Sequence, residues 1–395
     1  MRTLITFLLL IGPLYAQTPN FKIQVVDNQI AIGYGLAVGD VDGDRKPDIL
    51  MADQKEFVWY RNPGKAGDAW KRHVMAANLT PQDNVCIAAR DIDGDGRVEV
   101  AVGAGWNPSE TNDTTKSGAV FYLIRPKDPT QTWEPVRLHH EITTHRMRWA
   151  RVGNNQYQLI VVPLHGLGNK NGEGRGVRVL AYEPPKDVRK PWKRMMVDSA
   201  LHMTHNFEIW EDAGETRMLI GSKEGGKQVA YRNGRWMPVD RWIGAGNGMG
   251  EVRRGFQGDR KVPFVASVEP MHGNKLVVYK NGPIADAPNQ LMYGVQQTLT
   301  EQLSQGHALV CADFLKLGSD QVAVGWRNPN ADKKVGVRLF VPDNTLQTWK
   351  EYPLDDSVMM ACEDLQAADL DNDGDLDLIA SGRATLNVLI YWNQR

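Results

Sequence analysis

Cysteine is scarce in this sequence of 395 residues, and its scarcity excludes several classes of protein. Only Cys86, Cys311 and Cys362 are present, so at most one disulfide can form, and neither a disulfide scaffold nor a cysteine metal site is expected. After the first sixteen residues no apolar run is long enough to cross a bilayer. An excess of charge is also missing. Because 46 basic residues stand against 47 acidic ones, nothing favours nucleic acid or an anionic membrane as a partner.

The motifs of several common enzyme classes are absent as well. The sequence contains no GxSxG nucleophile elbow, no P-loop and no HExxH zinc motif. Glycines cluster at residues 33–35 and 244–248, but they do not open helices, so a dinucleotide-binding fold has no support. A hydrolase that uses Glu224 and Glu269 as paired carboxylates stays open, because the distance between them cannot be read from the sequence.

The N-terminus has the pattern of an export signal. Met1 and Arg2 precede the apolar run LITFLLLIGPLY, and Ala16 provides a small residue before a cleavage point at Gln17. The run is too short to serve as a membrane anchor. The sequence therefore predicts a signal peptide of residues 1–16 and a mature protein that is secreted or periplasmic.

Three short loops carry carboxylates at the spacing that hard divalent cations need. Calcium takes about six to eight oxygen ligands, and a loop that turns sharply at glycine can wrap four carboxylates around one ion. A single acidic loop is also explained as a surface turn, but three copies, each followed by an apolar strand, favour structural Ca2+ sites. The expected ligands are Asp40, Asp42, Asp44, Asp48, Asp91, Asp93, Asp95, Glu99, Asp369, Asp371, Asp373 and Asp377.

One unit of four strands recurs seven times along the chain. The first unit reads GYGLAVGD, PDILMAD, EFVWYRN and WKRHVM, and later units start near Asn206, Met249 and Ala308 without an aspartate turn. The last unit ends at NVLIYWN and lacks its outer strand, which residues 21–27 can supply from the N-terminus. The prediction is an all-β fold, a seven-bladed β-propeller closed by the N-terminal strand, as one domain over residues 18–395. The alternative, an array of β-sandwiches, gives the borrowed strand no role.

The repeated turns carry a family resemblance. DxDGDxxxD followed by an apolar strand resembles the FG-GAP or VCBS repeats of integrin-α-type propellers, most specifically in the first, second and seventh units. Adhesins, lectin-like surface proteins and some enzymes use such repeats, so the resemblance implies the fold and leaves the function open.

Polar side chains gather on the loops that face away from the aspartate turns. A lone histidine at a strand end is most often structural, but five of the nine histidines fall at equivalent positions around this predicted mouth, with carboxylates, guanidiniums and tryptophans beside them. Imidazoles that titrate near neutrality suit proton transfer beside a carbonyl, and a cation can meet the oxygen on which charge develops. Trp106 and Trp326 offer faces on which a sugar ring could stack.

A narrower resemblance points to the same chemistry. The strings PLHGLGNKNGEG, HMTHNFE, GSKEGG, EPMHG, QGHA and GWRNP are similar to the propeller of aldos-2-ulose dehydratase-like proteins. The resemblance implies a lyase in which a histidine removes the proton next to a carbonyl while an acid assists departure of the β-oxygen. It carries over to His165, His205, Lys223, Glu224, Glu269, His272, His307 and Arg327.

Two functions of different class follow. The first is a carbohydrate lyase or dehydratase that acts on a keto or anhydro sugar in the mouth, with His165 or His205 as base and His272 and His307 as orienting groups, acid partners or ligands of a second divalent metal. The second is a calcium-stabilised propeller that binds a glycan or protein without catalysis. The expected catalytic residues are His165, His205, His272, His307, Lys223, Glu224 and Arg146. The expected substrate-binding residues are His145, Trp106, Glu269, Trp326, Arg327 and Arg383.

Overall fold

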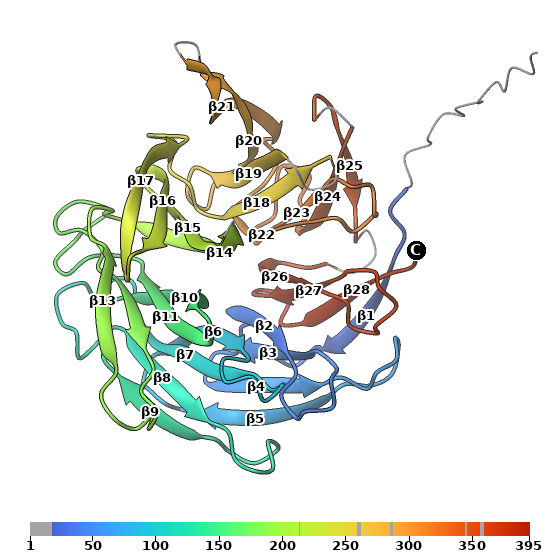
Figure 1. The fold of residues 1–395 in the computed structure, drawn as a ribbon. Coiled ribbons are helices and arrows are strands. Elements are labelled where there is room, and N and C mark those ends of the chain that lie inside the picture. Colours follow the sequence, from blue (N-terminus) through green and yellow to red (C-terminus); the bar gives the residue numbers. More distant parts are fainter. Residues whose placement is uncertain (1–17, 213, 259–261, 285–286, 344–345, 356–358) are drawn as a thin grey trace, which may run out of the picture.

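The computed structural model describes residues 18–212, 214–258, 262–284, 287–343, 346–355 and 359–395. These residues form 28 β-strands in seven four-stranded antiparallel sheets, arranged as the blades of a propeller (Figure 1). The described residues contain no helix, and therefore none that could span a membrane. The prediction of an all-β seven-bladed propeller is confirmed. The expected signal peptide lies outside the described residues.

The first three blades follow one another along the chain, each as four consecutive strands. Blade 1 consists of β2 (Gly35–Gly39), β3 (Asp48–Ala52), β4 (Glu56–Arg61) and β5 (Lys71–Ala77). Blade 2 consists of β6 (Asp83–Arg90), β7 (Glu99–Trp106), β8 (Ala119–Ile124) and β9 (Glu134–Leu138). Blade 3 consists of β10 (Thr144–Gly153), β11 (Gln156–Pro163), β12 (Val179–Glu183) and β13 (Lys193–Asp198).

The next three blades keep the same order although their sequences have diverged. Blade 4 consists of β14 (Thr204–Asp212), β15 (Glu215–Ser222), β16 (Gly225–Arg232) and β17 (Arg235–Ile243). Blade 5 consists of β18 (Val252–Gln257), β19 (Val262–Glu269), β20 (Lys275–Ile284) and β21 (Ala287–Thr300), and its last two strands form the hairpin that projects from the ring in Figure 1. Blade 6 consists of β22 (Gly306–Ala312), β23 (Gln321–Trp326), β24 (Gly336–Pro342) and β25 (Trp349–Pro353).

Blade 7 combines the two ends of the described chain. It consists of β26 (Cys362–Ala368), β27 (Asp377–Gly382), β28 (Val388–Asn393) and, as its outer strand, β1 (Phe21–Asp27). β1 pairs antiparallel with β28 from Phe21 opposite Asn393 to Asp27 opposite Val388, so the blue strand β1 and the red strand β28 meet in one sheet (Figure 1). The Trp392 indole also donates to Gln24 Oε1 at 2.7 Å.

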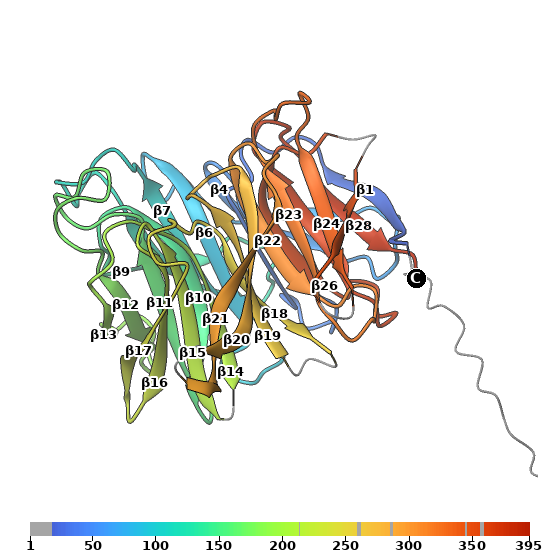
Figure 2. The same cartoon turned by 90° about the horizontal axis from the view of Figure 1, so that it is seen from above.

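The hydrophobic core lies between neighbouring blades. Alternate side chains of each strand face the blade on either side, and these faces are filled by Val, Leu, Ile, Ala and aromatic residues. Trp133 and Trp192, just before the outer strands β9 and β13, are buried, and their indoles donate to Pro129 O and Val188 O, at 3.0 and 2.9 Å. The first strands of the blades contact one another in a ring around the axis. Seen edge-on, the loops lie at the two faces of the disc (Figure 2).

Candidate active site and metal centres

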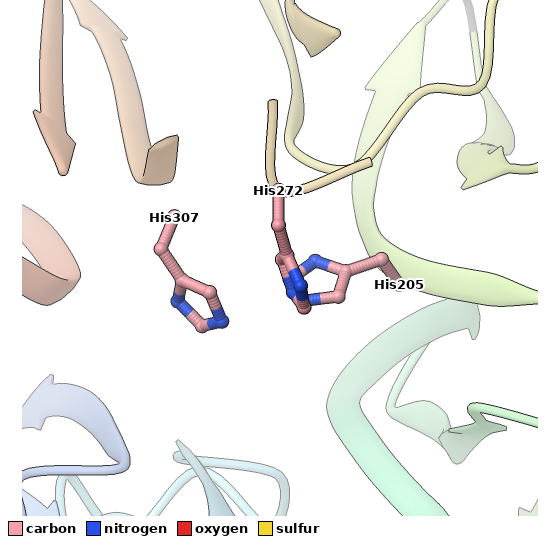
Figure 3. A group of neighbouring side chains, drawn as sticks. All are labelled: His205, His272 and His307. Atoms are coloured by element: carbon pink, nitrogen blue, oxygen red, sulfur yellow. The ribbon is translucent and has the colours of Figure 1, made fainter. Parts of the chain in front are cut away.

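Three imidazoles meet where the inner strands begin. His205 is in β14, His307 is in β22, and His272 is in the loop between β19 and β20, so three consecutive blades contribute one ring each. Figure 3 shows the three rings converging. Inner strands begin at the hub of a propeller, so residues about a hundred positions apart come together there. His205 and His307 are buried and His272 is half-buried. We call this group the histidine cluster.

The geometry of the histidine cluster suits a cation. The Nε2 atoms of His205 and His272 are 2.6 Å apart, and one ligand nitrogen from each of the three rings lies within 4.8 Å of the others. The ring centroids are 4.4 to 5.0 Å apart. Three imidazole nitrogens bound to one metal at about 2.1 Å with tetrahedral angles stand roughly 3.4 Å apart. The cluster is therefore of the size that one bound metal ion requires.

Hydrogen bonds fix how two of the neighbouring rings present their nitrogens. His307 Nδ1 lies 2.7 Å from the backbone oxygen of Glu363, and His145 Nδ1 lies 3.0 Å from that of His205. A carbonyl oxygen only accepts, so each Nδ1 carries the proton and each Nε2 of the neutral ring keeps its lone pair. His145 lies beside the cluster, 4.7 Å from His205 between ring centroids, and stacks on Trp106.

The mouth corrects one electrostatic expectation from the sequence. The imidazoles of His145, His205 and His307 do not titrate near neutrality, because burial holds their pKa values well below the ordinary one. Arg146 adds to this effect at all three rings, and Arg327 adds to it at His205 and His307. The pKa of His272 is lowered too, by burial and then by His205. These rings are neutral at pH 7. Neutral imidazoles are good metal ligands and weak bases.

Arginines from blades 3, 6 and 7 approach the residues of the mouth. Arg327, after β23, and Arg383, after β27, each donate to the buried carboxylate of Glu363 at 3.2 Å. The Glu363 carboxylate also lies 3.8 Å from His307 Nε2. Arg146 is buried and donates to the backbone oxygen of His145 at 3.2 Å. Two of the predicted cations, Arg146 and Arg327, thus lie close enough to the cluster to lower the pKa values of His205 and His307.

Other expected catalytic residues make contacts elsewhere. Glu224 accepts from the backbone and ring of His202, at 3.0 and 2.8 Å, and Lys223 is exposed and lies 3.4 Å from Asn171 O. The backbone of His165 forms an isolated antiparallel β-bridge with Met203. The Nδ1 atom of its ring is buried and has no hydrogen bond among the described residues. None of the ring contacts that hold the cluster together includes His165.

Glu269 belongs to a separate hydrogen-bond chain in blade 5. Its buried carboxyl accepts from Tyr279 Oη at 2.8 Å, and Tyr279 Oη accepts from Asn247 Nδ2 at 2.7 Å. Burial raises the pKa of Glu269 to about 7, against the lowering effect of the tyrosine. The carboxyl is therefore partly protonated near neutral pH.

The stacking role predicted for Trp326 is wrong. Its side chain is only 2% exposed and packs in the core between blades 5 and 6, and its indole donates to Lys334 O at 2.9 Å. Side chains alternate along β23, and Trp326 falls on the face that meets the neighbouring blade. Trp106 is half-buried and has one face against His145, so it keeps its place in the mouth.

The aspartate turns lie at the other ends of the inner strands and share one architecture. In each turn the ninth residue accepts from the backbone of the second: Asp48 from Val41 at 2.9 Å, Glu99 from Ile92 at 2.9 Å and Asp377 from Leu370 at 3.0 Å. Three carboxylates then come within 4.8 Å of one another, in the groups Asp40, Asp42 and Asp48; Asp91, Asp93 and Glu99; and Asp369, Asp371 and Asp373.

Cationic side chains approach several of these carboxylates. Arg61 lies 2.7 Å from Asp42, Lys46 lies 3.0 Å from Asp44, and Arg97 lies 2.6 Å from Asp95. Burial, with repulsion from neighbouring carboxylates, raises the pKa values of the ninth residues Asp48, Glu99 and Asp377 to about 7. A divalent cation would relieve this concentration of negative charge.

Blade 6 retains the same turn in a form that the sequence did not reveal. Gln321 stands at the ninth position, its Oε1 accepts from Leu315 N at 2.8 Å, and its Nε2 donates to Asp313 Oδ1 at 3.2 Å. Asp313 also accepts from Leu317 N and Gly318 N, both at 2.8 Å. In this turn the side-chain amide of Gln321 donates to the carboxylate of Asp313, whereas each of the other three turns brings several carboxylates together.

The fold and mouth define a propeller with a histidine cluster on its axis. Residues 40–102 match the family model of the FG-GAP-like repeat, and residues 117–282 match that of the beta-propeller domain of aldos-2-ulose dehydratase. The second match includes His145, His165, His205 and His272. Both resemblances seen in the sequence are therefore found by direct comparison.

A curated relative and several solved structures are similar to the chain. Aldos-2-ulose dehydratase from Phanerodontia chrysosporium is 24% identical over an alignment of 339 residues, which covers 78% of this chain and 36% of that protein, so the chain spans about a third of the relative's length. YCF48 from Cyanidioschyzon merolae has a TM-score of 0.52 at 9% identity, covering 94% of this chain and 98% of its own. The periplasmic gluconolactonase of Pseudomonas aeruginosa has a TM-score of 0.51 at 13% identity, covering 81% and 84%. These two structures support the fold alone.

Proposed function

We propose that the protein is a carbohydrate lyase that eliminates water or a related β-oxygen group from a keto or anhydro sugar in the propeller mouth. The observation that carries the proposal is the histidine cluster of His205, His272 and His307, with His145 and the arginines around it. The similarity to aldos-2-ulose dehydratase supports a carbohydrate as substrate, although this chain corresponds to only 36% of that protein.

The histidine cluster would hold the second divalent metal. His307 donates a hydrogen bond from Nδ1–H to Glu363 O, so its Nε2 keeps a free lone pair, and the low pKa values keep the rings neutral. Nitrogen ligands of this kind suit zinc and related transition metals. A divalent cation held there supplies Lewis-acid stabilisation of the negative charge that develops on a carbonyl oxygen.

The remaining residues of the mouth would carry out the proton transfers. His145 is neutral and donates its Nδ1–H to His205 O, so its Nε2 lone pair is available. Because His205 would be a metal ligand, His145 takes its place as the base that removes the proton next to the carbonyl. The electron pair of that C–H bond forms the new C=C bond, and the β C–O bond breaks. The electron pair of the C–O bond leaves with the oxygen, and the oxygen takes the proton that His145 has accepted and departs as water. Arg327 and Arg146 lie close enough to the cluster to influence its pKa values and could bind a substrate oxygen.

The low pKa values also favour a second candidate, a propeller that binds a glycan without catalysis, because weakly basic imidazoles are inefficient general bases. In that case the cluster would still bind metal, but no sugar would be turned over. The two candidates therefore differ in turnover and agree in metal content.

One experiment tests the proposal. The purified protein is analysed for metal, and keto and anhydro sugars are supplied while absorbance of an unsaturated product is followed in the ultraviolet. His307→Ala should lose the second metal, and His145→Ala should keep the metal and lower turnover by roughly 10²–10⁴. His139→Ala serves as the control, since His139 is an exposed histidine that bonds Glu141. Metal binding without turnover of any such sugar would favour the binding candidate, and wild-type turnover in both mouth variants would place the active site elsewhere.

Calcium and export complete the proposal. The carboxylate groups of blades 1, 2 and 7 would bind structural Ca2+, since Asp371 Oδ1 is buried without a hydrogen-bonding partner in the described chain. The N-terminal pattern of residues 1–16 would direct the protein to the periplasm or the exterior, where free calcium is available.

A further inference from the structure

A groove lined by basic side chains lies on the rim of the disc, between the outer strands of blades 2 and 3. It has a volume of about 310 Å3 and lies between β9 and β13, which are on the outer side of the ring in Figure 1. The cations that line it are Arg137 in β9, Arg189 and Lys190 in the loop between β12 and β13, and Arg194 in β13. No aspartate or glutamate is among the described residues that line it. We call it the rim groove.

Most of this positive charge has no counter-ion. Arg189 binds the carboxylate of Glu134, whereas Arg137, Lys190 and Arg194 form no ion pair with any residue that the structure describes. The simplest explanation is a solvated surface, since all four cationic side chains are exposed. Charges of one sign that line a concave surface, however, add their fields and attract the opposite charge from solution. The rim groove therefore attracts anions more strongly than a surface on which the same cations are paired.

Contacts at both ends of β9 fix the width of the rim groove. At the start of β9, Glu134 accepts two hydrogen bonds from the guanidinium of Arg189, at 2.9 and 2.6 Å. Just after the end of β9, the backbone oxygen of His139 accepts from Tyr182 Oη at 3.1 Å. Both contacts join blade 2 to blade 3. The groove is therefore formed before any ligand arrives, which lowers the ordering cost of binding.

The size and the lining of the rim groove favour a short acidic sugar chain. Its volume is that of a small ligand site, and a guanidinium binds a carboxylate through two parallel hydrogen bonds. Exposed Pro191 and half-buried Val136 offer apolar contacts to the C–H faces of a sugar ring. Trp192 and Tyr182 also line the groove, but they are only 7% and 1% exposed. They provide no platform on which a nucleic acid base could stack, so single-stranded nucleic acid is disfavoured.

We propose that the rim groove is a second carbohydrate site, which binds an oligosaccharide that carries uronate carboxylates. Arg137 and Arg194 would bind the carboxylates, and Lys190 would add a further positive charge. Only the choice of a sugar rests on the proposed function, because the groove uses no residue of the mouth. In a lyase of a sugar polymer, such a site would attach the substrate at a second point and raise its local concentration at the mouth.

The experiment measures binding of a fluorescently labelled tetragalacturonate to the purified protein by fluorescence anisotropy. The wild type should bind it, and added NaCl should weaken binding, because salt screens exposed charges. The fully methyl-esterified tetrasaccharide, which has the same rings without charge, should bind at least about tenfold more weakly. Lys190→Gln with Arg194→Gln should weaken binding of the acid about tenfold, since two exposed ion pairs are lost. Lys22→Gln with Lys71→Gln is the matched control, because both lysines are exposed on outer strands of other blades.

Each outcome supports or overturns the proposal. Both double variants should melt at the wild-type temperature, which shows that they are folded. No binding of the acid to the wild type, equal binding of acid and ester, or unchanged binding in the Lys190 and Arg194 double variant would each overturn the rim site. A glutamate peptide of equal charge, or a single-stranded oligonucleotide, that binds more tightly than the sugar would overturn the choice of a carbohydrate.

The rim site and the proposed catalysis can fail separately. Binding that depends on Lys190 and Arg194, in a protein that turns over no keto or anhydro sugar, would support the rim site and refute the catalysis. Turnover of such a sugar without binding of the tetragalacturonate would refute the rim site and leave the catalysis supported.

Discussion

Removal of β1 should open the ring, and the size of the effect can be worked out from the pairing. A chain that begins at Asn28 lacks Phe21–Asp27 and leaves the edge of β28 without a partner. A chain that begins at residue 18 is the matched control, because it loses residues 1–17 but keeps β1. The comparison isolates the strand itself.

Several interactions disappear together in the shorter chain. Six residue pairs join β1 to β28. At about one backbone hydrogen bond per pair and about 1 kcal/mol net for each, the loss is roughly 6 kcal/mol, a large part of the 5–15 kcal/mol that stabilises a typical domain. Tyr60 Oη also loses Asp27 Oδ2, at 2.8 Å, and Trp392 loses Gln24. The exposed edge carries Leu389, Ile390 and Tyr391, which are buried in the complete fold.

Thermal unfolding and size-exclusion chromatography measure the result. The shorter chain should unfold at a much lower temperature and associate through the open edge, because an unpaired apolar strand recruits other chains. A monomeric product with the melting temperature of the control chain would refute the reasoning, since β1 would then add nothing to the sheet.

Two further predictions concern charge. If the aspartate turns bind calcium, chelator should lower the melting temperature and excess Ca2+ should restore it. Each site should add about 2.7 kcal/mol to the free energy of unfolding at a Ca2+ concentration one hundred times Kd. Asp371→Asn should reduce the shift, and an unchanged melting curve with no bound metal would contradict the sites. Burial raises the pKa of Glu269 from 4.5 to about 7, so the native state holds a proton that the unfolded state has released, and stability should fall as pH rises through this window. In Glu269→Gln the free energy of unfolding should not fall over this pH range. Relative to the wild type it should rise by up to ~3 kcal/mol between pH 4.5 and 8, as measured by urea unfolding. Parallel pH profiles of the two proteins would contradict this prediction.

The fold could be predicted because its evidence is local and repeated. Each blade carries the same order of four strands, and residues 21–27 have the pattern of an outer strand, so the blade boundaries were visible even where the turns have diverged. The turn of blade 6 was missed for a physical reason. Gln321 stands where the other turns have Asp or Glu, and it accepts from the third residue of the turn, Leu315, instead of the second, so the sequence pattern by which the turn is found is lost.

The mouth was predicted in part. The position of a loop in the strand order of its blade indicates on which face of the propeller a residue lies, but not where on that face. His205, His272 and His307 do meet, whereas Glu224 turns to His202 and Trp326 packs between blades. The low pKa values of the imidazoles depend on burial and on arginines from other blades, which no local pattern reports.

The carboxylate turns and the histidine cluster divide the ring between them. The turns belong to blades 1, 2 and 7, which are adjacent because the chain closes on itself, while the imidazoles come from blades 4, 5 and 6. Oxygen ligands prefer calcium and nitrogen ligands prefer transition metals, so two different ions would brace opposite arcs of one disc. Chelators of different selectivity should then loosen the arcs separately, and heating after selective chelation should melt the protein in stages rather than in one cooperative step.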